Sequence, residues 1–141
     1  MTQITFYVCK VSTLQSRLLL ACRLTEKARE HGMSVYIHMD SARTTERMDD
    51  FLWGWSDTSF IPHAIAPDST VKVLLGDDDF SEEPMEKCDY LINLSNTIPS
   101  FFTHFKRMAE ILDPREENLR DGRQRYRFYQ EKGYQLDYHR L

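Results

Sequence analysis

Short apolar runs alternate with amphipathic stretches along the first two thirds of the chain, a pattern typical of α/β proteins. The runs that predict β-strands lie at residues 4–9, 34–39, 60–65, 71–75 and 90–94. Helices are predicted at residues 12–31 and 42–53, where apolar side chains recur every three or four positions. The first strand, helix and second strand form a βαβ unit with a right-handed crossover. The predicted fold is therefore α/β, a three-layer Rossmann-like arrangement with a mostly parallel five-stranded sheet flanked by helices.

The last part of the chain is predicted to be mainly helical. Apolar residues recur at helical spacing over residues 100–112, which predicts a helix that ends before Pro114. Pro114 can then open a final helix in its first turn, and Gly133 can end that helix. The residues after Gly133 are predicted to form a short extended or frayed end.

At 141 residues the chain is predicted to form one domain, residues 1–141. Its formal charge of −4 does not attract nucleic acid to the whole molecule, so binding of a polyanion needs a local basic patch. The three cysteines lack a C-x-x-C spacing, and Cys9 and Cys22 lie in apolar runs, which indicates buried thiols in a reducing cytoplasm rather than a redox pair or zinc site. No signal peptide is visible, and no apolar run approaches the roughly 20 residues that a membrane span needs.

The final predicted helix carries a row of arginines. Arg120, Arg123 and Arg127 fall within an arc of roughly 60° of the helix, and Tyr126 flanks that arc. Guanidinium groups beside an aromatic ring suit an acidic peptide with an apolar end, or a nucleic-acid backbone. The alternative interpretation is a solvated amphipathic helix whose arginines pair with acids of the same helix.

The segment after the second predicted helix is the most aromatic part of the chain. Trp53, Trp55 and Phe60 lie close together in sequence, and a turn this short cannot easily bury all three. An exposed aromatic cluster is a common anchor for a partner protein. The alternative is that these rings close one end of the core. Pro62 cannot donate to a strand ladder, so the short strand that contains it is predicted to lie near an edge.

No catalytic, metal or cofactor site is predicted. The link after the first strand, Lys10-Val-Ser12, has no glycine and no Gly-Lys-Ser/Thr motif, so the backbone cradle for a phosphate is missing. The five histidines are scattered over different elements, and no hydrolase or zinc-protease motif is found. The acidic run Asp77-Asp-Asp79 lacks the alternating spacing of a calcium loop, so a solvated loop is predicted there.

Five groups of residues, in this order and spacing, carry a family resemblance. They are Thr5-Phe-Tyr7, Phe51-Leu-Trp53, Ser59-Phe-Ile-Pro-His63, Asp89-Tyr-Leu-Ile-Asn-Leu94, and Arg125-Tyr-Arg-Phe-Tyr129 with Gly133-Tyr134. Over nearly its full length the chain resembles the chi subunit family of bacterial DNA polymerase III holoenzyme. The resemblance implies a nucleotide-binding-like α/β fold without a phosphate loop. It also implies a non-catalytic adaptor of the clamp loader, acting in DNA replication in the bacterial cytoplasm, at the replisome.

The resemblance also implies two partner surfaces. One holds the psi subunit, expected as a 1:1 heterodimer, and the other holds the acidic C-terminal tail of single-stranded DNA-binding protein (SSB), which ends in Pro-Phe. DNA is then reached through SSB. The psi surface maps to Trp53, Phe60, Pro62 and His63, and the tail surface to Leu112, Arg120, Arg123, Tyr126 and Arg127. The alternative function is direct binding of single-stranded nucleic acid by the C-terminal Arg/Tyr helix.

Overall fold

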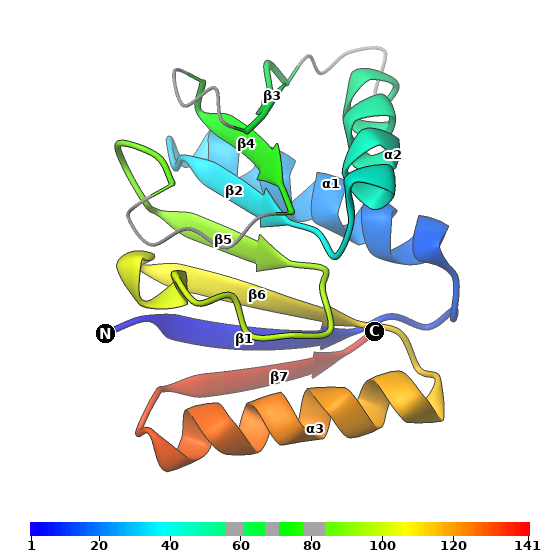
Figure 1. Ribbon diagram of the computed structural model, residues 1–141, viewed down its shortest axis with the longest axis vertical. Helices are drawn as coiled ribbons and strands as arrows, with labels where there is room; N and C mark the ends of the chain where they lie inside the picture. The colour runs from blue at the N-terminus through cyan, green and yellow to red at the C-terminus, as the bar shows by residue number, and fades with distance from the viewer. Residues whose placement is uncertain (56–60, 67–70, 78–83) are drawn as a thin grey trace.

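A single parallel β-sheet forms the middle of the molecule in the computed structural model, which describes residues 1–55, 61–66, 71–77 and 84–141 (Figure 1). The described strands are β1 (Gln3–Val8), β2 (Val35–His38), β3 (Ala64–Ile65), β4 (Val73–Gly76), β5 (Tyr90–Asn93), β6 (Arg107–Leu112) and β7 (Leu136–Arg140). They follow the order β3-β4-β2-β5-β6-β1-β7, and each neighbouring pair is parallel. The strand predicted over residues 60–65 is the shorter β3, which begins after Pro62; its predicted edge position is confirmed, because β3 lies at one end of this order.

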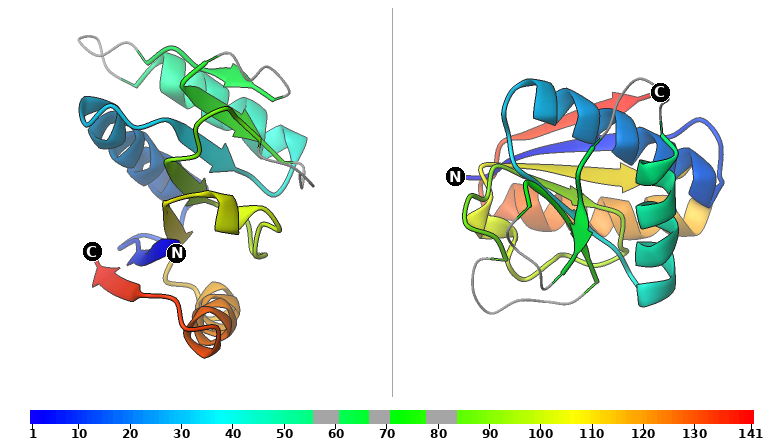
Figure 2. Two further views of the ribbon diagram at one scale, coloured as in Figure 1. Left: turned by 90° about the vertical axis from the view of Figure 1, so that its left-hand side faces the viewer. Right: turned by 90° about the horizontal axis from the view of Figure 1, so that it is seen from above.

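Helices cover both faces of this sheet (Figure 2). The elements are α1 (Leu14–Glu30), α2 (Ala42–Trp53), α3 (Glu116–Glu131) and a short 3-10 helix, η1 (Phe102–His104). The starts of α1 and α2 agree with the sequence, because the side chains of Thr13 and Ser41 accept hydrogen bonds from the backbone N–H groups three residues ahead. At the end of α3, Gly133 has a φ of 85°, a left-handed conformation that favours glycine, as predicted.

Two hydrophobic cores lie on opposite faces of the sheet. Alternate strand residues such as Ile37, Leu75 and Ile111 pack against α1 and α2, together with the buried Cys9 and Cys22. The intervening strand residues pack against α3 and the segment around η1. The three-layer prediction is thereby confirmed. Within the described residues, no helix is both long enough and apolar enough to cross a bilayer.

The predicted helix over residues 100–112 is wrong. The chain instead forms η1 and then the strand β6; with β7 at the C-terminal end, the sheet has seven described strands and not five. The apolar residues of this segment fit a helical period, but Met108–Leu112 is also a continuous buried run, as expected for a strand covered on both faces. The end predicted to be extended or frayed is strand β7, which pairs with β1 in parallel.

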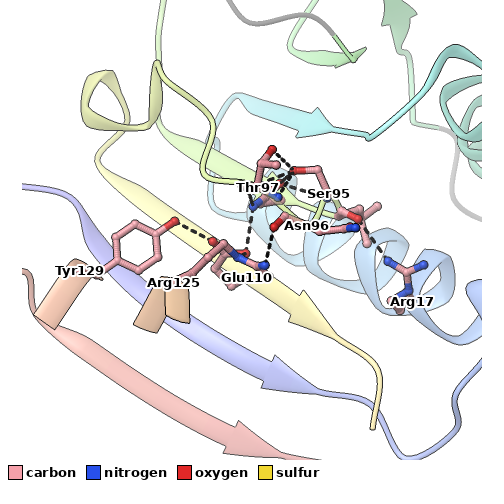
Figure 3. Close-up of polar contacts among 9 residues, drawn as sticks. Arg17, Ser95, Asn96, Thr97, Glu110, Arg125 and Tyr129 are labelled. Carbon is pink, nitrogen blue, oxygen red and sulfur yellow. Dashed lines mark hydrogen bonds and ion pairs between the residues drawn. The ribbon is translucent and has the colours of Figure 1, made fainter. Parts of the chain in front are cut away.

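Glu110 interrupted the apolar run in sequence, and its partners explain how β6 buries it. Its carboxylate accepts hydrogen bonds from Arg125 Nε at 3.2 Å, Tyr129 Oη at 2.6 Å and Asn93 Nδ2 at 2.9 Å (Figure 3). Burial raises the pKa of Glu110, and the Arg125 charge and these hydrogen bonds only partly offset that shift. Burial also raises the pKa of Tyr129, so its hydroxyl keeps the proton that it donates. The network joins α3 to the sheet and fixes the rotation of the helix.

Candidate peptide-binding groove

A hollow of about 520 Å³ lies between α3 and β7, next to the hydrophobic core that packs under α3. We call it the α3–β7 groove. Residues of four elements line it: Phe6, Leu112, Leu119, Gly122, Arg123, Tyr126, Arg127, Gln130, Tyr138 and Arg140. The volume falls within the range of roughly 300–1,000 Å³ that is usual for small-ligand sites. The groove can therefore hold one large side chain and part of an adjoining peptide.

Helix α3 divides its arginines between two sides. Arg123 and Arg127 line the groove, whereas Arg125 turns to the core and binds Glu110. The Nη1 atom of Arg123 lies 3.8 Å from Glu116 Oε1, but both side chains are largely exposed, so this pair is weak. The Arg120 side chain is exposed on the first half of α3 and does not line the groove. Two guanidinium groups thus remain available at the groove wall for an anion.

Aromatic and aliphatic side chains form the floor of the groove. The rings of Phe6 and Tyr126 meet edge to face, with 5.2 Å between their centroids. Leu112 closes the floor at the end of β6, and Gly122 lets α3 approach it closely. A β-carbon at Gly122 would collide with both Leu112 methyl groups. This floor offers an apolar surface directly beside the arginines.

The opposite wall of the groove comes from β7, in the segment predicted to be an extended or frayed end. Tyr138 and Arg140 line the groove from this strand, and both are exposed. The signal that could have identified them is the period-two pattern of Leu136-Asp-Tyr-His-Arg140, where Leu136 and Tyr138 alternate with polar residues. Arg140 adds a third cation to the groove lining.

The residues mapped to the psi surface lie at the other edge of the sheet. The Trp53 side chain is 51% exposed, and its ring lies 4.2 Å from the buried His63 ring. His63 is held by the carbonyl of Ile61, 2.7 Å from Nδ1, and by the Asp49 carboxylate, 3.0 Å from Nε2. Pro62 is exposed, whereas Phe60 lies outside the described residues. Trp53 and Pro62 are therefore exposed, and the buried His63 ring packs against the inner side of the Trp53 ring.

Trp55 has a different environment from Trp53. It is half-buried, packs against the core on the α1 and α2 side of the sheet, and donates a hydrogen bond from Nε1 to Glu26 at 2.9 Å. The two tryptophans thus differ: the core-closing interpretation applies to Trp55, and the partner-anchor interpretation stays a prediction for Trp53. Trp55 closes part of the core, and Trp53 is exposed.

The two candidate surfaces are separated by the width of the sheet. β3 lies beside α2 at one end of the strand order, and β7 lies at the other end. Six inter-strand steps of about 4.8 Å place these edges roughly 29 Å apart. The two candidate surfaces therefore do not overlap.

Protein side chains fill the carboxyl end of the central strands, where open α/β sheets commonly bind ligands. Arg17 of α1 donates from Nη1 to the Leu94 carbonyl at 3.1 Å (Figure 3). Its Nε lies 3.7 Å from the Asp113 carboxylate. Among the described residues, no group of three or more His, Cys, Asp or Glu side chains could hold a metal ion. The α3–β7 groove and the exposed surface around Trp53 and Pro62 are thus the candidate sites supported by both sequence and structure.

The fold and these surfaces define a small α/β domain with candidate binding surfaces at the two edges of its sheet. A family model described as "DNA polymerase III chi subunit, HolC" matches residues 1–137. The chain is 39% identical over its whole length to the DNA polymerase III subunit chi of Pseudomonas aeruginosa, covering 98% of that protein. It is 26% identical to the protein of that name from Escherichia coli strain K12, over 84% of this chain and 81% of that one. The chain belongs to the DNA polymerase III chi subunit family, which confirms the resemblance and indicates an accessory role in DNA replication.

Proposed function

We propose that the chain is a non-catalytic adaptor subunit of the replicative DNA polymerase III holoenzyme. It links the clamp loader, through the psi subunit, to the C-terminal tail of SSB. The observation that carries this proposal is the α3–β7 groove, where Arg123, Arg127 and Arg140 surround a floor made by Phe6 and Leu112. Cations beside an apolar hollow match a short acidic peptide that ends in an aromatic residue.

In this proposal the terminal Phe of the tail enters the hollow beside Tyr126. Its carboxylate and the preceding aspartates form ion pairs with Arg123 and Arg127. The exposed Arg120 adds to the positive electrostatic potential around the groove. The buried ring supplies most of the residence time, while the charges supply orientation and the rate of encounter. Because the arginines are exposed, the affinity decreases as the salt concentration rises.

The psi subunit binds the opposite edge of the sheet in a 1:1 heterodimer. Trp53 is the main anchor there, together with Pro62 and Phe60, and His63 holds the Trp53 ring in place. The separation of the edges allows psi and the tail to be bound together. Each SSB tetramer carries several tails, so several modest contacts can hold the complex on coated DNA. This role places the chain in the bacterial cytoplasm, at the replisome.

Calorimetry with an acidic peptide ending in Pro-Phe tests the tail site. We expect binding by the full peptide and a loss of at least about 30-fold when the last residue is removed, because a buried aromatic anchor contributes about 2 kcal/mol or more. The Arg123→Ala variant should lose the peptide and keep psi in pull-downs. Equal loss of both partners, or of neither, would contradict the assignment of the site.

Direct binding of single-stranded nucleic acid is the alternative for the same groove. A bare oligonucleotide titrated under the same conditions separates the two functions. The adaptor proposal requires the peptide to bind and the oligonucleotide to bind much more weakly, as the net charge of −4 suggests. Stronger binding of the oligonucleotide would favour the alternative.

A further inference from the structure

Within the part of the chain that the structure describes, β7 has a free outer edge. It is last in the strand order and pairs with β1 alone (Figure 1). The strand contains neither proline nor lysine, two residues that commonly protect edge strands. The N–H and C=O groups on such an edge are a template for an added strand from another chain.

The pairing with β1 determines which residues of β7 present these groups. Ile4 N donates to the carbonyl of Gln135, and Leu141 N donates to the carbonyl of Val8, each at 3.0 Å. In a parallel pair, the residues bonded to the neighbouring strand alternate with residues whose backbone groups point away from it. The outward-pointing residues are Leu136, Tyr138 and Arg140.

The side chains of the same residues lie on the groove side of the sheet. Tyr138 is in register with Phe6, and Arg140 is in register with Val8. Phe6 and Val8 are both buried in the core under α3, and Tyr138 and Arg140 line the α3–β7 groove. The free edge and the groove are therefore continuous, because the residues that offer their backbone to a new strand also form one wall of the groove.

We propose that the peptide bound in the groove continues along β7 as an eighth strand of the sheet. This inference rests on the proposed function, and it adds the manner in which the residues before the terminal Phe are recognised. Backbone hydrogen bonds to Leu136, Tyr138 and Arg140 fix the extended peptide, independently of its side chains. The partner is thus an extended acidic segment and not merely a C-terminal residue.

The direction of the added strand follows from placing the terminal Phe at the Leu112 end of the hollow. Leu112 and Arg140 are both in register with Val8, so the end of the groove near Leu112 lies at the carboxyl end of β7. A terminal Phe at that end leaves the preceding residues running back towards Leu136. The added strand is therefore parallel to β7, and about five residues cover its length of roughly 17 Å.

Charge complementarity supports an acidic occupant on this edge. Arg123 and Arg127 face it from α3, and Arg140 faces it from β7. Of the β7 residues, only Asp137 is acidic, and its in-register partner is Thr5, on the sheet face opposite the groove. Aspartates of the peptide whose side chains point to the groove would contact these arginines, while the peptide backbone pairs with β7.

A scan of N-methylated peptides tests the inference on the unaltered protein. Each peptide of about nine residues ends in Pro-Phe and carries one backbone N-methyl group, which removes one donor without changing the charge. We expect losses in affinity of roughly three- to tenfold at alternate positions, and little change at the positions between them. This period of two is the signature of a paired strand, since only every second N–H faces β7.

A pair of variants at Tyr138 provides a second test. Tyr138→Pro removes the outward N–H, whereas the residues bonded to β1 are its neighbours, so the β1–β7 ladder is kept. The matched control, Tyr138→Val, loses the same ring and retains the N–H. The inference predicts that Tyr138→Pro binds the long peptide three- to tenfold or so more weakly than Tyr138→Val. The two variants should bind a terminal dipeptide, Pro-Phe, equally.

The outcomes distinguish this inference from the proposed function. If the loss of affinity is the same at every methylated position, or absent at all of them, while the unmodified peptide binds normally, the eighth strand is wrong and the adaptor role is unaffected. Absence of binding by the unmodified peptide overturns the tail site itself. A dimer in analytical ultracentrifugation that excess peptide does not dissociate, and that Tyr138→Pro disrupts but Tyr138→Val does not, would mean that a second copy covers the β7 edge, which also overturns the inference.

Discussion

Arg125 and Glu110 form a buried ion pair, with 3.2 Å between Nε and Oε1. Both side chains are almost completely removed from solvent. Arg125 also donates from Nη1 to the Asn96 carbonyl at 2.8 Å, so the guanidinium holds both β6 and the segment after β5. This contact fixes the rotation of α3, and through it the direction in which Arg123 and Arg127 point. A structural arginine thus positions the arginines of the groove.

Replacing Arg125 with Met should destabilise the fold strongly. The change leaves the Glu110 carboxylate buried without its counter-charge, which costs about 3–5 kcal/mol. Urea unfolding followed by circular dichroism measures this loss. The matched control, Arg123→Ala, removes an exposed guanidinium and should change the free energy of unfolding by no more than about 0.5 kcal/mol. Similar stability of the two variants would show that the buried pair does not anchor α3.

The helix side of the groove is visible in the sequence, whereas its strand side is not. Arg123, Tyr126 and Arg127 share one side of a helix, which local periodicity can reveal. Tyr138 and Arg140 belong to the same site only because β7 pairs with β1, more than 120 residues earlier in the chain. Such pairing depends on long-range contacts, and a short terminal segment carries a weak local signal for it.

The wrong helix over residues 100–112 has a related cause. Glu110 falls on the polar side of a helical wheel, so the local pattern favours a helix. In the structure its charge is balanced by Arg125, and its hydrogen bonds come also from Tyr129 and Asn93, on other elements. A buried acid whose partners lie elsewhere in the chain cannot be distinguished from an exposed one by periodicity.

The Gly122→Ala variant should weaken tail binding. A methyl group at this position collides with Leu112, so α3 or Leu112 must shift and the floor of the groove narrows. Overpacking of this kind typically costs about 1–3 kcal/mol of stability. We expect a loss of peptide affinity in calorimetry that exceeds any change in psi binding, because the proposed psi surface lies at the other edge.

Gly133→Ala is the matched control for this variant. Gly133 has open space around its α-carbon, but its φ of 85° strains any residue with a β-carbon. The change should cost about 1–2 kcal/mol of stability and leave the affinity for the peptide unaltered. If both glycine variants weaken peptide binding equally, then general destabilisation, and not the shape of the floor, explains the loss.

Asp113 should contribute to stability in a pH-dependent manner. Burial acts to raise the pKa of Asp113, but hydrogen bonds from Arg115 and Asn118 outweigh burial and place the pKa below its usual range. A carboxyl group with a lowered pKa in the folded state stabilises the fold above its unfolded pKa of about 3.9, and this stabilisation is lost as the pH falls through the lower folded value.

The free energy of unfolding of the unaltered chain and of Asp113→Asn, measured from about pH 7 to about pH 2.5, tests this dependence. The difference between the two proteins should be constant down to about pH 5 and shrink below about pH 4. Glu117→Gln, at an exposed position of α3, serves as the control. A difference that grows as the pH falls would contradict the lowered pKa.

Trp53→Ala should abolish most of the affinity for psi while leaving the tail peptide bound. The exposed Trp53 ring packs against the His63 ring. An aromatic anchor of this kind typically contributes about 2 kcal/mol or more to binding, so its removal should lower the affinity about 30-fold. Surface plasmon resonance with immobilised psi measures the change, and calorimetry with the tail peptide shows whether the groove is intact. Trp55→Phe is the control, because Trp55 packs against the first core and loses only its hydrogen bond to Glu26. Unchanged psi affinity in Trp53→Ala, or an equal loss in both tryptophan variants, would move the psi surface away from this edge of the sheet.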